Sequence, residues 1–338
     1  MIPLYKLRRP GQTMDMSADA YLSDFESFRH LPHAITLLGM SGVGKTMLST
    51  QLRRRADWFH YSADYRIGTR YLVEHILDNI KYKIMRMEDP FVANLLRSDS
   101  IYINHNISVD NLDPVSTFLG MFGDPAEGGL TKATFLERQN LYKWGEQESM
   151  KDTGHFIAKA WEIYRCKDFI NDASGSLCEV VDLTDPNDPV IVALRADTLI
   201  LYIRAGKIEE EALMERAETD PKPLFYYPSF IEEYLADQPD DGRGVGPKDF
   251  ARKLFPGLLQ SRKPRYAEMA NKYGFTIDVA DLFADPPAGQ IVPDVDKVLF
   301  RIFETIHAQS ADNPVAAANA THYVNACLAR AERRALAF

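Results

Sequence analysis

The chain has 338 residues, a net charge of −9 and a sequence pI near 5.4. This length fits one large or two ordinary domains, and 46% hydrophobic with 26% charged residues is typical of a globular protein. The acidic balance argues against nucleic acid as the main partner. No apolar run approaches the roughly 18 residues of a membrane span. Three cysteines, Cys166, Cys178 and Cys327, are not at metal-ligand spacing. We therefore expect a cytoplasmic protein with reduced thiols, no nucleic-acid partner and no membrane partner.

The first segment, residues 1–33, is expected to be an N-terminal arm followed by one short helix from Ala18 to His30. An apolar stripe along this helix should pack against the core beside the first strand. The stripe consists of Tyr21, Leu22, Phe25 and Phe28.

Residues 34–46 carry the most specific signal in the chain. A short apolar run over residues 34–38 predicts a buried strand, and apolar positions at helical spacing follow Thr46. Between them the sequence fits the phosphate-loop pattern G-x-x-x-x-G-K-[ST] without mismatch. The residues are Gly39, Met40, Ser41, Gly42, Val43, Gly44, Lys45 and Thr46. Such a loop surrounds a polyphosphate with backbone N–H groups, so Lys45 should reach the β- and γ-phosphates of ATP and Thr46 should bind Mg²⁺.

The first half of residues 58–71 is aromatic and predicts a second strand that ends at Asp64, after which the pattern is helical. Ligands of an open α/β sheet lie at the carboxyl ends of its strands, so Asp64 is expected on the same edge as the loop. There its carboxylate could accept the proton of an attacking hydroxyl. Arg66 and Arg70, one helical turn apart, could hold an anionic acceptor. The alternative is that Asp64 caps a surface helix.

This order of loop, strand and acid resembles the shikimate kinase family of small-molecule P-loop kinases. The family reads F-x-D-x-D-x-x-I at this place. Here Asp64 matches the second acid, Ile67 matches the last position, and Ser62 replaces the first acid. The resemblance implies a P-loop kinase fold with a mainly parallel sheet.

Residues 75–165 are longer than that family needs, and we expect them to form a helical insertion that acts as a lid over the acceptor. The pattern is helical from Glu74 to Met87, irregular over residues 99–125, and helical again from Lys132 to Tyr164 with a break near residues 152–154.

A third strand is expected to end at Asp172. The following small residues, 173–176, resemble the family's glycine-rich turn after its third core strand. Asp172 is then the candidate carboxylate near Mg²⁺, and a purely structural turn is an equal alternative.

The next segment resembles the family's strand, L-x-x-R helix and R-P-L lid. A strand is predicted over residues 198–203 and a helix over residues 209–216. Arg216 ends this helix, and Lys222 stands where the family has the lid arginine. The resemblance implies that both cations cover the transferring phosphoryl group, where positive charge stabilises the transition state.

Residues 258–270 resemble the family's R-x-P-x-Y-x-E-x-A helix start, which implies that Arg262 contacts the acceptor. The alternative is a solvated basic cluster before a helix. A last core strand is expected over residues 274–278. Residues 238–247 should form a flexible loop, and helices are expected over residues 294–309 and 315–336.

Together these patterns predict a P-loop kinase-like α/β domain over residues 34–290, with the insertion at 75–165. The C-terminal helices of residues 291–338 should serve packing or homo-oligomer formation. The preferred function is ATP- and Mg²⁺-dependent phosphorylation of a small, anionic, hydroxyl-bearing metabolite. The main alternative is a regulatory ATPase or nucleotide-dependent switch, which the long insertion and Ser62 favour. A third reading is a binding protein that has lost catalysis.

Overall fold

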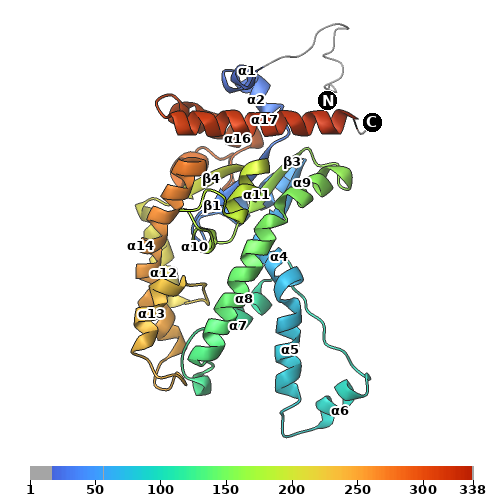
Figure 1. Ribbon diagram of the computed structural model, residues 1–338, viewed down its shortest axis with the longest axis vertical. Coiled ribbons are helices and arrows are strands. Elements are labelled where there is room, and N and C mark those ends of the chain that lie inside the picture. The colour runs from blue at the N-terminus through green and yellow to red at the C-terminus, as the bar shows by residue number, and fades with distance from the viewer. Residues whose placement is uncertain (1–16, 56, 337–338) are drawn as a thin grey trace.

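The computed structural model describes residues 17–55 and 57–336 (Figure 1). Its centre is a five-stranded parallel sheet. The strands are β1 (Ala34–Leu38), β2 (Trp58–Ser62), β3 (Asp168–Asp172), β4 (Leu199–Arg204) and β5 (Gly274–Asp278). They lie in the order β2-β3-β1-β4-β5. The predicted α/β class with a mainly parallel sheet is confirmed. The expected arm over residues 1–16 lies outside the described residues.

The strand register explains why functional groups can meet at the carboxyl-terminal ends of the strands, called the carboxyl edge of the sheet below. The central strand β1 is buried at all five positions, as expected for a parallel strand covered on both faces. Asp172 pairs with Leu37 on one side and with Ser62 on the other. The carboxyl ends of β1, β2 and β3 therefore finish level with one another, and the residues that follow them meet at this edge.

Helices cover the sheet and extend from it. Those outside the predicted insertion are α1 (Ala18–Leu22), α2 (Phe25–Arg29), α3 (Lys45–Arg55), α4 (Ala63–Arg66), α10 (Leu177–Val180), α11 (Pro189–Asp197), α12 (Lys207–Thr219), α13 (Pro228–Ala236), α14 (Pro247–Tyr273), α15 (Val279–Leu282), α16 (Val295–Ser310) and α17 (Pro314–Leu336). In and beside the insertion lie the π-helix η2 (Ile67–Leu72), α5 (Val73–Ile84), α6 (Phe91–Arg97), α7 (Asp113–Leu119), the 3₁₀ turn η3 (Pro125–Glu127), α8 (Lys132–Lys151) and α9 (Thr153–Glu162).

The long helix α17 closes the amino-terminal edge of the sheet, and α16 packs beside it (Figure 1). Tyr323 bonds to the ring of His33 just before β1, with 2.8 Å between Oη and Nδ1. Arg334 donates to the carbonyl of Lys167 just before β3, at 2.8 Å. The predicted C-terminal helices are confirmed, and their inner faces belong to the main core. The carboxyl ends of the strands lie next to the other helices instead.

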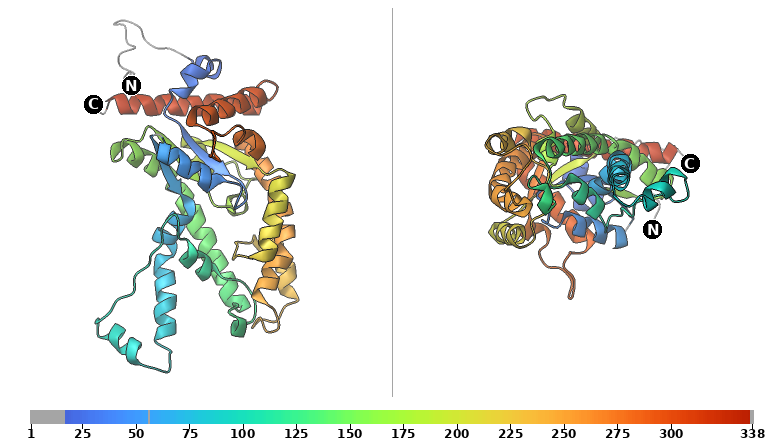
Figure 2. Two further views of the ribbon diagram at one scale, coloured as in Figure 1. Left: turned by 180° about the vertical axis from the view of Figure 1, so that it is seen from behind. Right: turned by 90° about the horizontal axis from the view of Figure 1, so that it is seen from below.

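From the carboxyl edge, separate groups of helices extend away from the sheet: α12 with α13 and α14, α7 with α8, and α5 with α6 (Figures 1 and 2). The first two groups share a second hydrophobic core. Its buried members are Phe122, Phe135, Tyr226, Ile231, Leu235, Phe250, Ala251 and Leu258. The loop over residues 238–247 packs against this end, because the carbonyl of Val245 accepts the Asp124 N–H at 2.8 Å.

Three local expectations differ from the structure. Residues 18–30 form two helices, because Asp24 adopts an extended conformation and its carboxylate caps α2 by accepting the Ser27 N–H at 2.8 Å. The irregular stretch over residues 99–125 contains α7. The expected helix start near Arg262 is wrong: this residue lies inside α14, which continues through Pro256 and Pro264.

Within the described ranges, no helix is both long enough and apolar enough to cross a bilayer.

Candidate functional site

The loop from Gly39 to Thr46, called the glycine loop below, joins the end of β1 to α3 at the carboxyl edge. Its glycines have backbone φ angles of 140° (Gly39), 97° (Gly42) and 99° (Gly44), which side chains rarely tolerate. A Cβ on Gly39 would stand 2.8 Å from the carbonyl oxygen of Ile203 in β4. The predicted strand, loop and helix are thus present in order. Ser41, Gly42 and Thr46 are exposed, so this part of the loop is open to a ligand.

Lys45 folds back over the start of the glycine loop. Its buried ammonium donates to the carbonyl oxygens of Gly39 at 2.7 Å and Met40 at 3.1 Å. Burial lowers the pKa of Lys45, and the nearby carboxylates of Asp172 and Asp64 oppose that shift. The lysine, the loop and two acids from the ends of β2 and β3 therefore converge, as the sequence predicted.

Asp64 is not the cap of its helix. Ser62 fills that role, because its hydroxyl accepts the Tyr65 N–H at 3.3 Å at the start of α4. The Asp64 carboxylate instead accepts a hydrogen bond from the hydroxyl of Tyr142 on α8, at 3.1 Å. Burial, followed by the charge of Asp172, raises the pKa of Asp64 to about 6. The alternative of a simple capping role is wrong, and the serine that replaces the family's first acid supplies the cap.

Asp172 ends β3 and is buried beside the ring of His60 on β2. The distance between His60 Nε2 and Asp172 Oδ2 is 3.5 Å. No side chain or backbone group of the described residues forms a hydrogen bond with either ring nitrogen of His60. Sequence reasoning treated His60 only as part of a strand. The parallel pairing of β2 with β3, which brings the two side chains together, has no local signature.

Glu146 is a buried acid that the sequence reasoning missed. It lies in the middle of α8, and its carboxylate accepts hydrogen bonds from the hydroxyls of Ser174 and Ser176, the latter at 2.6 Å. Burial raises the pKa of Glu146 to about 7. The sequence contained a signal for this acid, because Arg138, Tyr142 and Glu146 stand four residues apart and therefore share one face of the helix.

The turn after β3 presses directly against the glycine loop. A Cβ on Gly175 would stand 2.7 Å from the backbone nitrogen of Ser41. The small residues predicted here therefore allow close approach to the loop backbone. Tyr266 on α14 donates its hydroxyl proton to the Gly175 carbonyl at 2.5 Å, which fixes the turn from the other side.

Arg262 is the second anchor of this turn. Its guanidinium is buried and donates to the Gly175 carbonyl at 2.7 Å, the Phe225 carbonyl at 2.7 Å and the Glu179 carboxylate at 2.6 Å. The alternative of a solvated basic cluster is wrong for this residue. Arg262 joins the turn to the segment that carries Lys222, and contact with an acceptor remains a prediction.

The remaining predicted cations occupy different positions. Arg66 is paired with Asp152, with Nε and Nη2 at 2.8 Å and 2.7 Å from Oδ2, whereas Arg70 is exposed. Arg216 lies against the glycine loop, since a Cβ on Gly42 would stand 2.5 Å from its Nη1. Lys222 is 66% exposed, with its ammonium 3.7 Å from Asp220.

Oxygen ligands for a magnesium ion are available at this edge. The exposed Thr46 hydroxyl and the Asp172 carboxylate are hard donors of the kind that Mg²⁺ prefers. In the described residues there is no cluster of three or more His, Cys, Asp or Glu side chains that could hold a metal alone. Such a set fits an ion that is completed by phosphate oxygens and water.

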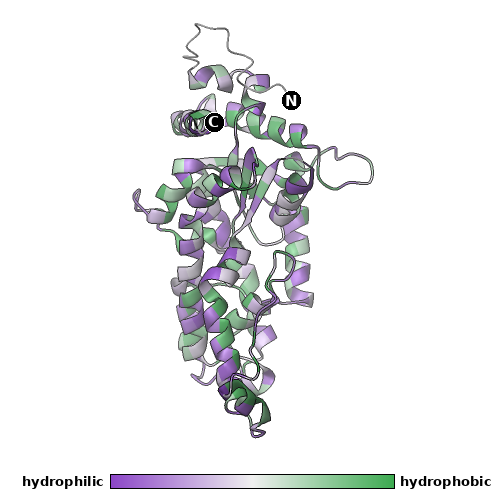
Figure 3. Cartoon of the chain, turned by 90° about the vertical axis from the view of Figure 1, so that its right-hand side faces the viewer, coloured by the Kyte–Doolittle hydropathy of each residue, from purple (hydrophilic) through white to green (hydrophobic). Residues whose placement is uncertain are grey.

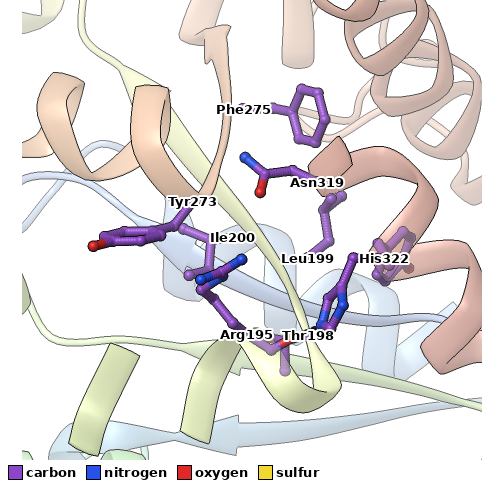
Figure 4. Close-up of a pocket in the computed structure, with 9 residues that line it drawn as sticks. Arg195, Thr198, Leu199, Ile200, Tyr273, Phe275, Asn319 and His322 are labelled. Atoms are coloured by element: carbon purple, nitrogen blue, oxygen red, sulfur yellow. Dashed lines mark hydrogen bonds between the residues drawn. The ribbon is translucent and has the colours of Figure 1, made fainter. Parts of the chain in front are cut away.

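A small pocket lies near the amino-terminal ends of the strands, between β4, β5 and α17 (Figure 4). It is lined by Arg195, Thr198, Leu199, Ile200, Tyr273, Phe275, Asn319, His322 and Tyr323. Because these residues stand at the amino-terminal end of β4, the pocket is separate from the glycine loop.

No family model, curated protein or solved structure matched the chain.

Proposed function

We propose that the chain is an ATP- and Mg²⁺-dependent phosphotransferase that acts on a small hydroxyl-bearing metabolite. The observation that carries this proposal is the placement of Asp64. Its carboxylate is partly buried near Lys45 at the end of the glycine loop, is oriented by Tyr142, and is not used to cap its helix. A positioned carboxylate next to a phosphate-binding loop is what proton removal from an acceptor hydroxyl requires.

Each residue then has a role in the transfer. The backbone of the glycine loop and the Lys45 ammonium bind the phosphates of ATP. Asp64 accepts the proton of the acceptor hydroxyl as its oxygen attacks the γ-phosphorus, and the bond from that phosphorus to the β–γ bridging oxygen breaks to release ADP. Arg216, already in place against Gly42, stabilises the negative charge of the transferring group. Thr46 and Asp172 would hold Mg²⁺, which when bound neutralises charge on the phosphate oxygens.

Whether the site can bind a negatively charged acceptor depends on which arginines have no partner that already holds them. Arg66 is engaged by Asp152, and Arg262 by Glu179 and two carbonyl groups. Arg70 is exposed and is therefore the residue among these three that can turn to an anionic acceptor. Lys222 is exposed on the segment after α12, a position from which it could close over the phosphates.

A screen of metabolites by mass spectrometry tests this function. The full chain with Mg²⁺ and ATP should add the mass of one phosphoryl group to a metabolite. Lys45→Ala should abolish the product by weakening ATP binding, whereas Asp64→Asn should abolish it with ATP affinity nearly unchanged. Product formation that survives in Asp64→Asn would refute the role of Asp64.

A nucleotide-dependent switch is the second candidate, and one observation favours it. Asp64 lies on a helical run, α4, η2 and α5, that continues without a break from the site into the insertion. A change at Asp64 on nucleotide binding would reach α5 through this run. Slow ATP hydrolysis with no phosphorylated metabolite in the same screen would support the switch.

A further inference from the structure

The imidazole of His60 is buried although it forms no hydrogen bond with the described part of the chain. Its side chain has an exposed fraction of 0%, and both ring nitrogens lack a hydrogen-bond partner. Among the residues that the structure describes, His60 is the only one with two such side-chain atoms. A buried polar group without a hydrogen bond lowers the stability of a fold, so this histidine calls for a functional explanation.

The strand pattern places His60 on the face of the sheet that carries Asp172. The preceding residue in β2, Phe59, contacts the ring of Phe156 on α9, with 6.5 Å between the ring centroids. Because side chains alternate along a strand, His60 points to the opposite face, together with Ser62. Asp172 pairs with Ser62 in register, so its side chain lies on that face as well. Figure 3 shows hydrophilic residues among the hydrophobic ones along the strands.

The two side chains meet through one atom of each. Nε2 of His60 lies 3.5 Å from Oδ2 of Asp172. A carboxylate only accepts hydrogen bonds, so Nε2 is the ring nitrogen that carries the proton in this pair. The second oxygen of the carboxylate is then the one available to a metal ion.

The same carboxylate also acts on the residues of the candidate site. Its charge opposes the lowering of the Lys45 pKa and contributes to the raised pKa of Asp64. The helix α3, which begins with Lys45 and Thr46, packs against both β2 and β3. His60 from β2 and Lys45 from α3 thus approach one carboxylate from two different elements.

We propose that His60 is a positioning residue that holds the Asp172 carboxylate in the orientation that binds Mg²⁺. This role rests on the proposed function, because it requires the ion that Thr46 and Asp172 would hold. A partner behind a metal ligand fixes the direction of that ligand, and its loss commonly costs about 10- to 100-fold in metal affinity. Contacts of this kind often shorten in the complex, so 3.5 Å between Nε2 and Oδ2 fits a pair that closes on the ion.

Calorimetric titration with the non-hydrolysable analogue β,γ-imido-ATP measures this role without turnover. The wild-type chain should bind the analogue more tightly in Mg²⁺ than in EDTA, and the ratio of the two dissociation constants reports the ion. His60→Leu should reduce this ratio by about tenfold or more, with the affinity in EDTA unchanged. Its midpoint of urea unfolding should stay the same or rise, because two unpartnered nitrogens leave the interior. A histidine with only a structural role would give the reverse pattern.

Two polar variants identify the nitrogen that acts, and they decide the question even if His60→Leu does not fold. The amide nitrogen of a glutamine side chain reaches about as far as Nε2, whereas that of asparagine lies near Nδ1. His60→Gln should therefore keep most of the Mg²⁺ effect, and His60→Asn should lose it.

His33→Leu is the matched control, because His33 is a second buried histidine that lies away from the glycine loop. It is 1% exposed just before β1, and its Nδ1 lies 2.8 Å from the hydroxyl of Tyr323. Its replacement should lower the midpoint of unfolding and leave the Mg²⁺ ratio unchanged.

The possible failures are distinguishable. A wild-type chain that does not bind the analogue, or binds it equally in Mg²⁺ and EDTA, would refute the proposed function and the role of His60 with it. A wild-type Mg²⁺ effect that His60→Leu retains, or that His33→Leu reduces equally, would refute only the role of His60. Equal loss of the effect in His60→Gln and His60→Asn would refute that role as well.

Discussion

Gly175 and Ser41 lie in backbone contact, although 134 positions separate them along the chain: a Cβ on Gly175 would stand 2.7 Å from the Ser41 nitrogen. The contact joins the turn after β3 to the exposed part of the glycine loop. Any side chain at position 175 must move one of these two backbones. Because the loop binds through its N–H groups in our proposal, its shape and its affinity for nucleotide should change together.

Gly175→Ala tests this relationship. The added methyl group should displace the glycine loop and weaken ATP binding at least tenfold, measured by calorimetric titration. Gly257→Ala in α14 is the control, because its Cβ would meet only the Phe230 ring at an ordinary 3.4 Å. That variant should bind ATP like the wild type. Equal affinity in all three proteins would show that the contact does not shape the loop.

The pKa of Asp64 predicts how the rate depends on pH. As a general base, Asp64 must be ionised, and burial with the nearby Asp172 raises its pKa to about 6. The kcat/KM of the free enzyme should therefore fall tenfold per pH unit below about pH 6. Asp64→Asn should lose on the order of 10²-fold or more in rate and should lack this acidic limb. A wild-type profile that stays flat down to pH 5 would exclude Asp64 as the base.

Glu146 should make the fold less stable at alkaline pH. Its folded pKa of about 7 lies above the unfolded value, so the folded state binds the proton more tightly. Stability therefore falls as pH rises from about 4 to 7. Glu146→Gln keeps one acceptor oxygen for a serine hydroxyl and can donate an amide N–H to the other serine oxygen. It should raise the free energy of unfolding at pH 8 by about 1–3 kcal/mol relative to wild type. The difference should shrink as pH falls and be near zero at about pH 4 in urea titrations. A gain of equal size at both pH values would contradict this origin.

Variants of the buried pair Arg262 and Glu179 distinguish the cost of an unpaired buried charge from the role of Arg262 in positioning the turn after β3. Arg262→Met leaves an unpaired buried carboxylate and should lower the free energy of unfolding by about 3–5 kcal/mol. Adding Glu179→Gln removes that charge and should restore part of the loss. Both proteins still lack the donor to the Gly175 carbonyl, so both should bind ATP more weakly than wild type. Denaturant unfolding and calorimetry on the same samples measure the two effects. Full recovery of ATP affinity in the double variant would refute the positioning role.

Lys222 should affect the rate without affecting the fold. Its side chain is largely exposed, so Lys222→Ala should change stability by less than about 0.5 kcal/mol. If Lys222 closes over the transferring phosphoryl group, kcat and kcat/KM should fall together, with ATP affinity less affected. Lys222→Arg should recover part of the rate. Lys207→Ala is the control, because Lys207 is an exposed lysine at the start of α12, and it should leave the rate unchanged. Wild-type rates in Lys222→Ala would leave Arg216 as the next residue to test.

Local sequence patterns were sufficient to predict the strands and the glycine loop. Each strand is a short apolar run between turn residues, and the glycines of the loop occupy φ angles that other residues avoid. The helix start expected near Arg262 was wrong, because it came from the resemblance to the family's R-x-P-x-Y-x-E-x-A pattern, in which Pro264 takes the proline position. Packing against the turn after β3 and against the second core instead holds α14 continuous through that proline.

The partners of the site acids could not be predicted locally. Ser62 looked like a lost acid, yet it caps α4 and leaves Asp64 to Tyr142. Glu146 joins the site because α8, some eighty residues after Asp64, packs against α4 and bonds to the serines of the turn after β3. Such contacts depend on how the insertion folds back on the sheet, which no single stretch of sequence specifies.

The π-helix η2 sets the rotational phase of α5 relative to Asp64. A π turn holds about one residue more than an α turn, so α5 is offset by one residue from a regular α-helix begun at Asp64. Since each α-helical residue turns the chain by about 100°, conversion of η2 to an α-helix would rotate the face of α5 that carries Ile80 and Ile84 by about that angle. Deleting one residue within η2 would leave this face in register, whereas the same deletion early in α5 would turn it away. Six residues next to Asp64 thus decide which way a surface at the far end of the molecule faces.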